Sequence, residues 1–262
     1  MNQLEILRES LGQCDEIILD ALLMRNRIVE EIMAYKEANN LQILQPEQEA
    51  KQKEWLHRRL KEKRHQAEVE AVFDSIIKNS KKIQARKLFD YNIVLIGFMG
   101  AGKSTISSYL RDMFAMDVVE MDQVIAEKEG MSISDIFETY GEEYFRELET
   151  NLLIEMQSRS NVVVSCGGGV PMRERNVTEM KKNGRVVLLT AKPETILERV
   201  KDNHDRPLLE NNKNVSFIAD LLEKRRAKYE AAADIVVETD GKSELEICEE
   251  LIHRLREAEA NK

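Results

Sequence analysis

Glycine and proline are unevenly distributed along the 262 residues of the chain. Residues 1–90 contain one glycine, Gly12, and one proline, Pro46, whereas the other ten glycines and three prolines lie in residues 91–262. Both residue types interrupt regular structure, so a stretch almost free of them is typical of long helices. A stretch punctuated by them is typical of alternating strands and helices. The sequence therefore predicts an all-α domain over residues 1–88 and an α/β domain over residues 89–262.

The composition excludes several classes of protein. Residues 1–90 balance 16 basic against 16 acidic side chains, so the net charge of −9 belongs to residues 91–262 and argues against nucleic acid as a partner. The longest apolar run, at residues 93–96, is too short to cross a bilayer. Cys14, Cys166 and Cys248 lie too far apart to predict a disulfide framework or a metal site. With no secretory leader evident, we expect a cytoplasmic protein.

One long helix is predicted at the start of the chain. Its apolar stripe consists of Leu4, Leu7, Leu11, Cys14, Ile18, Leu22, Arg25, Ile28, Ile32 and Tyr35. Steps of three and four residues predict a helix from about residue 4 to residue 38, roughly 50 Å long. Shorter helices are predicted after Pro46 and from about Ala67. Since three helices of such unequal length cannot bury so long a stripe, we expect a homodimer in which two long helices pair.

Two cations on this helix point in the same direction. Arg25 lies within the apolar stripe, and Lys36 follows eleven residues later, about 20° further around the helix. A buried arginine needs an anionic partner, so the pair predicts an anion site. Arg8 lies about 25 Å away along the helix and reaches that site only from an antiparallel second chain. The alternative is that all three are ordinary salt-bridged residues on a helix surface.

Residues 4–84 resemble the all-helical bacterial chorismate mutases. The resemblance runs through LEILRESLGQCDEIILDALLMRNRIVEEIMAYK, then PEQE, then DSIIKNSKKIQ. It implies an intertwined dimer that rearranges chorismate to prephenate, with one arginine donated across the interface. The chorismate-binding residues it implies are Arg8, Arg25, Lys36, Glu49, Ser80 and Gln84.

In the implied roles, Arg8 and Arg25 clamp the two carboxylates, while Lys36 and Gln84 bond the ether oxygen, which gains negative charge. Glu49 accepts a hydrogen bond from the ring hydroxyl. The chain departs from the family at two positions: Gln45 stands where an acidic residue is frequent, and Gln48 where an arginine is frequent. Because Gln48 removes a charge beside the substrate, we expect weaker binding.

A phosphate-binding loop is predicted near the start of the second domain. The segment YNIVLIGFMGAGKST places Gly97–Ser104 in the pattern G-x-x-x-x-G-K-S, after an apolar run and before a helical pattern. Glycines let backbone N–H groups turn onto phosphate oxygens, and the helix N-terminus adds its dipole. In such a loop Lys103 bridges the β- and γ-phosphates and Ser104 binds Mg²⁺.

Further strands are predicted at residues 118–121, 162–165, 185–190 and 235–237, separated by helical patterns. Such alternation is typical of a doubly wound parallel sheet, whose ligands bind at the carboxyl ends of the strands. Asp122 follows the second strand, and Gly167, Gly168 and Gly169 follow the third. A triple glycine there indicates close approach of the backbone to a ligand, although a tight turn is the alternative.

Residues 91–258 resemble shikimate kinase. The matching segments are GFMGAGKST, EMDQVIAEKEGMSISDIFETYGEEYFRELE, SCGGGV, RPLL and RRAKYEAAADIVVET. The resemblance implies ATP as phosphoryl donor, Mg²⁺ as cofactor with Ser104 as its ligand, and shikimate as acceptor. The ATP-binding residues it implies are Gly100, Ala101, Gly102, Lys103, Ser104, Thr105, Arg199 and Arg206. The shikimate-binding residues it implies are Asp122, Arg146, Gly167, Gly168, Gly169 and Arg225.

The resemblance also implies catalytic roles. Asp122 orients the attacking hydroxyl and accepts its proton. Lys103 and Arg206 stabilise the transferring phosphoryl group, Arg206 from a polar lid over residues 201–215. Arg199 lies beside the adenine.

Supporting residues follow from the same resemblance. Phe137 and Phe145 wall the shikimate pocket, and Glu149 orients Arg146 from one helical turn away. The chain departs from the family at Glu120, where aspartate is common. A carboxylate remains there, so we expect activity to be kept.

Three hypotheses follow. The first is a bifunctional enzyme of aromatic amino acid biosynthesis with both activities on one chain. The second keeps the kinase and makes residues 1–88 a dimerisation or regulatory module. The third replaces shikimate with another small acceptor, such as gluconate or a nucleotide.

Overall fold

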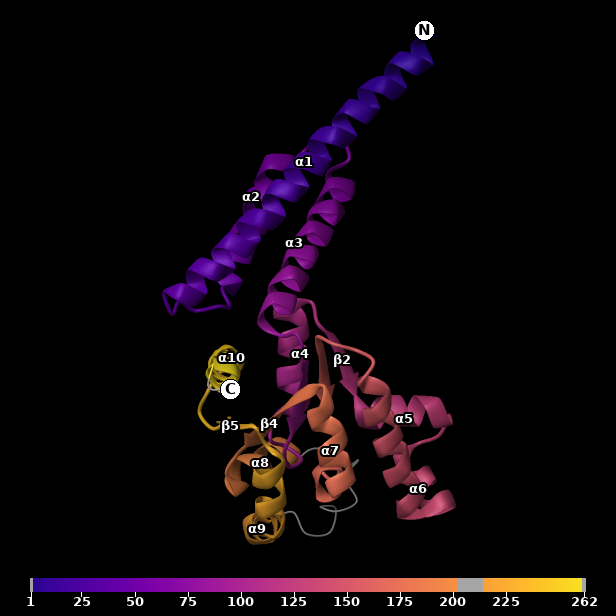
Figure 1. Cartoon of the computed structure of the whole chain (residues 1–262), viewed down its shortest axis with the longest axis vertical. Helices are drawn as coiled ribbons and strands as arrows, with labels where there is room; N and C mark the ends of the chain where they lie inside the picture. Colours follow the sequence, from indigo (N-terminus) through magenta and orange to yellow (C-terminus); the bar gives the residue numbers. More distant parts are fainter. Residues whose placement is uncertain (1, 202–213, 261–262) are drawn as a thin grey trace. The chain divides into compact units, whose positions relative to one another are not determined.

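The computed structural model describes residues 2–201 and 214–260. It divides into two compact units, Met1–Lys87 and Leu88–Lys262. Figure 1 shows both units and labels their α-helices and three of the strands, β2, β4 and β5. In the described residues, every helix is too short or too polar to span a membrane.

The first unit is built of helices alone. α1 spans Gln3–Ala38, α2 spans Pro46–Leu60 and α3 spans Gln66–Leu88. At the start of α1, Asn2 and Glu5 cap each other's backbone N–H groups, which satisfies donors that a helix otherwise leaves unpaired. Pro46 occupies the first turn of α2, where its missing N–H costs nothing. The three predicted helices are confirmed.

The core of the helical unit is small and lies toward the C-terminal half of α1. Val29 and Met33 of α1 are buried there with Leu56 of α2 and Ile77 of α3. The N-terminal half of α1 contributes nothing to this core. Its apolar side chains remain exposed: Leu7 and Leu11 keep 61% and 62% of their surface. A single chain therefore leaves most of the predicted stripe uncovered.

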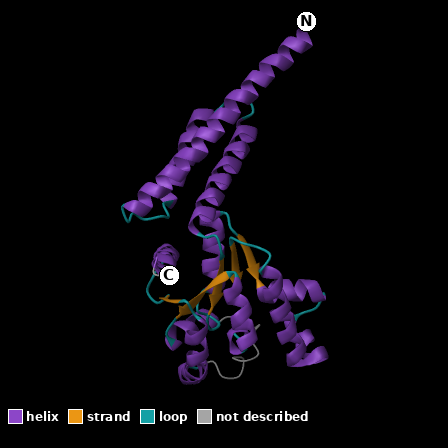
Figure 2. Ribbon diagram, viewed as in Figure 1, coloured by secondary structure: helices purple, strands orange, loops and turns teal. Residues whose placement is uncertain are grey.

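The second unit is a parallel sheet with helices around it (Figure 2). Its strands are β1 (Asn92–Ile96), β2 (Asp117–Glu120), β3 (Val162–Ser165), β4 (Gly184–Thr190) and β5 (Ile235–Glu238). Its helices are α4 (Lys103–Phe114), α5 (Met121–Glu129), α6 (Ile133–Met156), the short η1 (Val170–Met172), α7 (Glu174–Lys182), α8 (Pro193–Val200), α9 (Val215–Ala232) and α10 (Glu244–Ala260). The predicted α/β fold class is confirmed.

The strand order is β2-β3-β1-β4-β5, and every neighbouring pair is parallel. β1 lies between β3 and β4, and Leu95 is level with Ser165 of β3 while Ile96 is level with Leu188 of β4. Sheet order reverses at β1, so the loops after β1 and β3 diverge there and leave a crevice. All residues of β1 and β3 are buried, which makes this part of the sheet a rigid base for those loops.

Candidate functional site

The loop after β1 folds tightly because glycines occupy its left-handed positions. Gly97 has φ +144°, and a Cβ there would lie 2.4 Å from the carbonyl oxygen of Leu189. Gly100 has φ +77°, and a Cβ there would lie 2.9 Å from Cγ1 of Val200. Any larger residue at either position would push the loop away from β4 and α8. The loop ends at Gly102, the N-cap of α4, and the N-terminus of that helix favours an anion.

Lys103 and Ser104 open α4 at the floor of the crevice. Nζ of Lys103 donates to the carbonyl oxygens of Gly97 and Phe98, at 2.9 and 3.1 Å. Oγ of Ser104 lies 3.1 Å from Oε2 of Glu120, at the end of β2. The longer side chain of Glu120 thus still reaches the serine that the loop motif assigns to the metal. A hydroxyl beside a carboxylate is an oxygen donor set that suits Mg²⁺.

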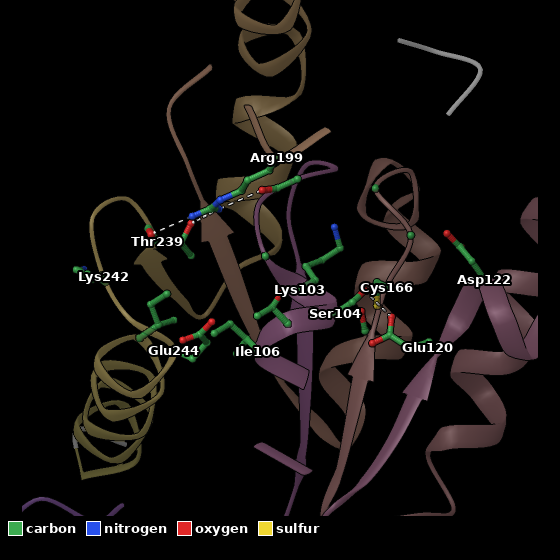
Figure 3. A pocket seen from close by; sticks show the side chains of 17 residues that line it. Lys103, Ser104, Ile106, Glu120, Asp122, Cys166, Arg199, Thr239, Lys242 and Glu244 are labelled. Atoms are coloured by element: carbon green, nitrogen blue, oxygen red, sulfur yellow. Dashed lines mark hydrogen bonds between the residues drawn. The ribbon is translucent and has the colours of Figure 1, made fainter. Parts of the chain in front are cut away.

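A cavity of about 480 Å³ extends over this loop (Figure 3). Its walls come from the phosphate-binding loop, the ends of β2 and β3, α8, and the segment after β5. Arg199 donates through Nη1 to the carbonyl oxygen of Gly100 at 3.1 Å and to Oγ1 of Thr239 at 3.0 Å. It therefore joins the loop to the end of β5. Gly100, Gly102, Lys103, Ser104, Thr105 and Arg199 all line the cavity, whereas the buried Ala101 does not.

The triple glycine after β3 lies against three charged side chains. A Cβ on Gly167 would lie 2.7 Å from Oδ1 of Asp122. One on Gly169 would lie 2.7 to 2.9 Å from the guanidinium atoms of Arg146, and one on Gly168 would lie 3.8 Å from Nη1 of Arg225. Three residues from α5, α6 and α9 thus meet at one backbone turn, and side chains on the turn would displace two of them.

Arg146 is held by two carboxylates. Its Nη1 donates to both oxygens of Glu149 at 3.0 and 2.9 Å, and its Nη2 donates to Oε1 of Glu142 at 2.9 Å. Burial alone would lower the pKa of Arg146, but Glu149 and Glu142 raise it. Burial raises the pKa of Glu149 to about 7, against the opposing effect of Arg146. The arginine therefore stays charged and has a fixed orientation.

A second cavity, also of about 480 Å³, adjoins this turn and is lined by Arg146, Gly169 and Arg225. Arg173 and two glutamates line it as well, and three arginines around one small space favour a carboxylate ligand. The predicted aromatic residues sit behind the first arginine: Cζ of Arg146 lies 5.5 Å from the ring centre of Phe145 and 6.0 Å from that of Phe137.

Pattern reasoning missed Tyr229, which supports the other arginine. Its hydroxyl donates to the carbonyl oxygen of Gly168 at 2.7 Å. Burial raises the pKa of Tyr229, and the neighbouring Arg225 lowers it in part. Arg225 itself lies over the ring of Phe98, with Cζ 5.8 Å from its centre. Tyr229 follows Arg225 by four residues on α9, which was the available signal.

The predicted lid lies mostly outside the described residues. Arg206 is among residues 202–213, so its role stays a prediction.

In the helical unit, four of the predicted residues make contacts between different elements. Nη1 of Arg25 donates to Oγ of Ser80 on α3. Burial lowers the pKa of Arg25. Lys36 is buried, and its Nζ donates to the carbonyl oxygen of Ile43 at 2.7 Å. Glu49 on α2 pairs with Lys81 on α3, a residue that sequence reasoning missed.

The other two predicted residues of this site are Gln84 and Arg8, and they differ in burial. Gln84 is half-buried on α3, one turn beyond Ser80. Arg8 is exposed, on the part of α1 that lies beyond the core. Because Arg8 lies outside the core of its own chain, its role in a site shared between two chains stays a prediction.

Known proteins resemble both units. Residues 99–256 match the family model for shikimate kinase, and residues 7–85 match the family model for chorismate mutase type II. A shikimate kinase of Persephonella marina is 43% identical over 165 residues, which cover 63% of this chain and 99% of that protein. One from Geobacter sulfurreducens is 41% identical over 166 residues, covering 63% of this chain and 91% of that protein.

Solved structures agree with the sequence relatives. The shikimate kinase of Acinetobacter baumannii, solved in complex with shikimate, superposes with a TM-score of 0.59 at 33% identity, over 66% of this chain and 96% of that one. The shikimate kinase of Aquifex aeolicus superposes with a TM-score of 0.55 at 39% identity, over 63% of this chain and 96% of that one. The chain thus belongs to the shikimate kinase family and carries, ahead of the kinase domain, a chorismate mutase type II domain.

Proposed function

We propose that the α/β unit transfers the γ-phosphoryl group of ATP to shikimate, giving shikimate 3-phosphate. The observation that carries this proposal is the convergence of Asp122, Arg146 and Arg225 on the triple-glycine turn beside the phosphate-binding loop. Shikimate is a carboxylated triol. Two arginines suit its carboxylate, and one aspartate suits a hydroxyl.

The geometry supports distinct roles along the reaction path. Asp122 lines the nucleotide cavity and takes the proton of the attacking hydroxyl as the new P–O bond forms. Lys103, at the loop, stabilises charge on the transferring phosphoryl group. Ser104, with Glu120 beside it, would hold Mg²⁺, which supplies positive charge at the β- and γ-phosphates. Arg199 holds the loop against the end of β5.

The experiment that tests this proposal offers ATP with a panel of acceptors to the full chain: shikimate, gluconate and nucleoside monophosphates. We expect phosphorylation of shikimate alone, and a rise of about a hundred-fold in the KM for shikimate in Arg146→Ala, because a charge-assisted contact to a carboxylate is lost. Phosphorylation of gluconate or a nucleotide in preference to shikimate would overturn the proposal.

For the helical unit we propose rearrangement of chorismate to prephenate, with the site shared between two copies of the chain. Support comes from the contact of Arg25 with Ser80, from the buried cation of Lys36, and from the exposed apolar stripe of α1. The cations clamp the substrate carboxylates and hold the reacting ends together. The stripe pairs with that of a second copy, which brings its Arg8 to the site.

Loss of chorismate and gain of prephenate, followed with the full chain, test the mutase proposal. Arg25→Ala removes a cation that faces the substrate in both ground and transition states, and we expect kcat/KM to fall by about a hundred-fold or more. Shikimate phosphorylation by the same variant serves as the control for folding. An intact chain without chorismate turnover would leave the helical unit as a dimerisation module.

A further inference from the structure

Lys81 lies on the face of α3 that carries the predicted mutase residues. Ile77, Ser80, Lys81 and Gln84 are spaced by three and four residues, so their side chains lie along one side of the helix. Ser80 on this face contacts Arg25 of α1, and Lys81 contacts Glu49 of α2. The same face of α3 therefore contacts both other helices. Lys81 is the residue next to Ser80, which accepts a hydrogen bond from Arg25.

The contact between Lys81 and Glu49 is close and partly buried. Nζ of Lys81 lies 2.7 Å from Oε2 of Glu49, and the two side chains keep 15% and 31% of their surface. A lysine this far from solvent costs free energy unless a counter-charge faces it. Exposed lysines usually point outward instead, as Lys78 does one turn earlier. The carboxylate of Glu49 supplies that counter-charge and fixes the cation at this place.

The residue before Glu49 carries no charge. Gln48 therefore brings no cation from α2 to the carboxylate of Glu49. Lys81 brings one from α3 instead, at 2.7 Å. The cation on α3 therefore both holds this carboxylate and offsets its charge.

Resting on the mutase activity proposed above, we infer that Lys81 is a positioning residue of the chorismate site, which holds the carboxylate of Glu49 and supplies the positive charge beside it. Arg25, Lys36 and Lys81 come from one chain and Arg8 from the second copy, so four positive charges stand against the one negative charge of Glu49. This excess of positive charge suits a substrate with two carboxylates. Without Lys81, the carboxylate of Glu49 would face a dianion with one less cation to offset it.

Lys81 acts on the substrate through Glu49. The ion pair holds the carboxylate where it accepts a hydrogen bond from the ring hydroxyl, a group distant from the bond that breaks. A contact of this kind is made equally in ground and transition states, so its loss raises KM more than it lowers kcat. A change in KM with little change in kcat therefore distinguishes a residue that positions the substrate from one that takes part directly in the rearrangement.

The test compares full-length Lys81→Met with wild type in the chorismate assay. We expect the KM for chorismate to rise about tenfold while kcat changes less than about threefold. Lys81→Arg keeps the charge and should hold KM within about threefold of wild type. Gln48→Arg added to Lys81→Met returns the charge from α2 and should recover most of the lost affinity. Lys78→Met, an exposed lysine on the same helix, is the matched control and should leave KM unchanged.

Two outcomes distinguish a failure of the role inferred for Lys81 from a failure of the proposed mutase activity. If wild type turns over chorismate and Arg25→Ala does not, but Lys81→Met keeps the wild-type KM and only its unfolding midpoint falls, the ion pair is purely structural and the inference is overturned. A recovery of KM by Gln48→Arg is a result that a purely structural pair would not produce. If wild type shows no chorismate turnover, the proposed function fails, and this inference with it.

Discussion

The two units of this chain bury their apolar surface in different ways. In the α/β unit, β1 and β3 are buried along their whole length, and the surrounding helices close over them. In the helical unit, α1 buries Val29 and Met33, yet Leu4, Leu7, Leu11 and Ile18 each stay more than half exposed. A sheet that is wound on both faces completes its core within one chain, whereas a long helix needs a partner along its whole length.

This difference extends to the candidate sites. Asp122, Arg146 and Arg225 come from three helices of one unit and meet at one turn, so a single chain supplies these residues of the proposed kinase site. Arg25 and Lys36 are fixed by contacts within the helical unit, while Arg8 stays exposed on the uncovered part of α1. We therefore expect the two activities to respond differently to substitution and to association of chains.

The largest effect is expected for Lys103→Ala. Removing the cation from the phosphate-binding loop should lower kcat for shikimate phosphorylation by about a thousand-fold, because charge on the transferring phosphoryl group loses its stabilisation. Chorismate turnover by the same preparation should stay within about twofold of wild type. Equal loss of both activities would contradict two independent sites.

Mixing two inactive variants tests whether the mutase site is shared. Arg8→Ala and Arg25→Ala chains should each lose nearly all mutase activity. After unfolding and refolding together, half of the dimers are mixed and one site of each is intact, so about a quarter of wild-type activity should return. Shikimate phosphorylation serves as the measure of refolded protein. No recovery in a mixture with full kinase activity would place Arg8 outside the shared site.

A smaller effect is expected for Leu11→Glu on the exposed stripe. Burial of a leucine in each of two chains contributes about 3 kcal/mol or more, so the charged variant should weaken self-association at least about a hundred-fold. Sedimentation equilibrium measures this directly. Glu9→Gln, a polar change on the same helix, is the matched control. A variant that associates like wild type would show that the stripe is not the contact surface.

The smallest effect concerns Glu149 and pH. Burial raises its pKa to about 7 in the folded protein, whereas an unfolded glutamate titrates near 4.5. The folded state then binds the extra proton between these values, so Glu149 makes stability fall as pH rises through this window. The change is at most about 3 kcal/mol by the end of it.

Thermal unfolding between pH 5 and pH 8 tests this, using the transition that shikimate shifts. Glu149→Gln cannot ionise and should show a flatter dependence on pH than wild type. It should also bind shikimate more weakly, since Arg146 loses a bidentate partner. Parallel pH profiles for the two proteins would show that Glu149 does not titrate in this range.

Much of the fold was predictable because its signals are local. Glycine and proline content separated the two units, the spacing of apolar residues gave α1, and the motif at Gly97–Ser104 placed the phosphate-binding loop between β1 and α4. The second strand ends one residue earlier than predicted, because Met121 already belongs to α5, and Asp122 stands in the first turn of that helix. These features depend on neighbouring residues alone.

The contacts of Lys81 and Tyr229 were not predictable in the same way. Lys81 follows Lys78 and precedes Lys82 in an ordinary basic helix, and only the packing of α2 against α3 brings it to Glu49. The hydroxyl of Tyr229 donates to Gly168, which lies 61 residues earlier in the chain. The spacing from Arg225 placed Tyr229 near that arginine, but partners as distant as Gly168 leave no periodic signal.

By itself, the sequence determined the two fold classes, the phosphate-binding loop and the residue types able to hold anionic metabolites. These follow from backbone preferences and apolar periodicity, which act over a few residues. The tertiary structure decided which of those residues meet: three glycines against Asp122, Arg146 and Arg225, and a lysine against Glu49. Such contacts depend on how whole elements pack, because charges act on one another through space and not along the chain.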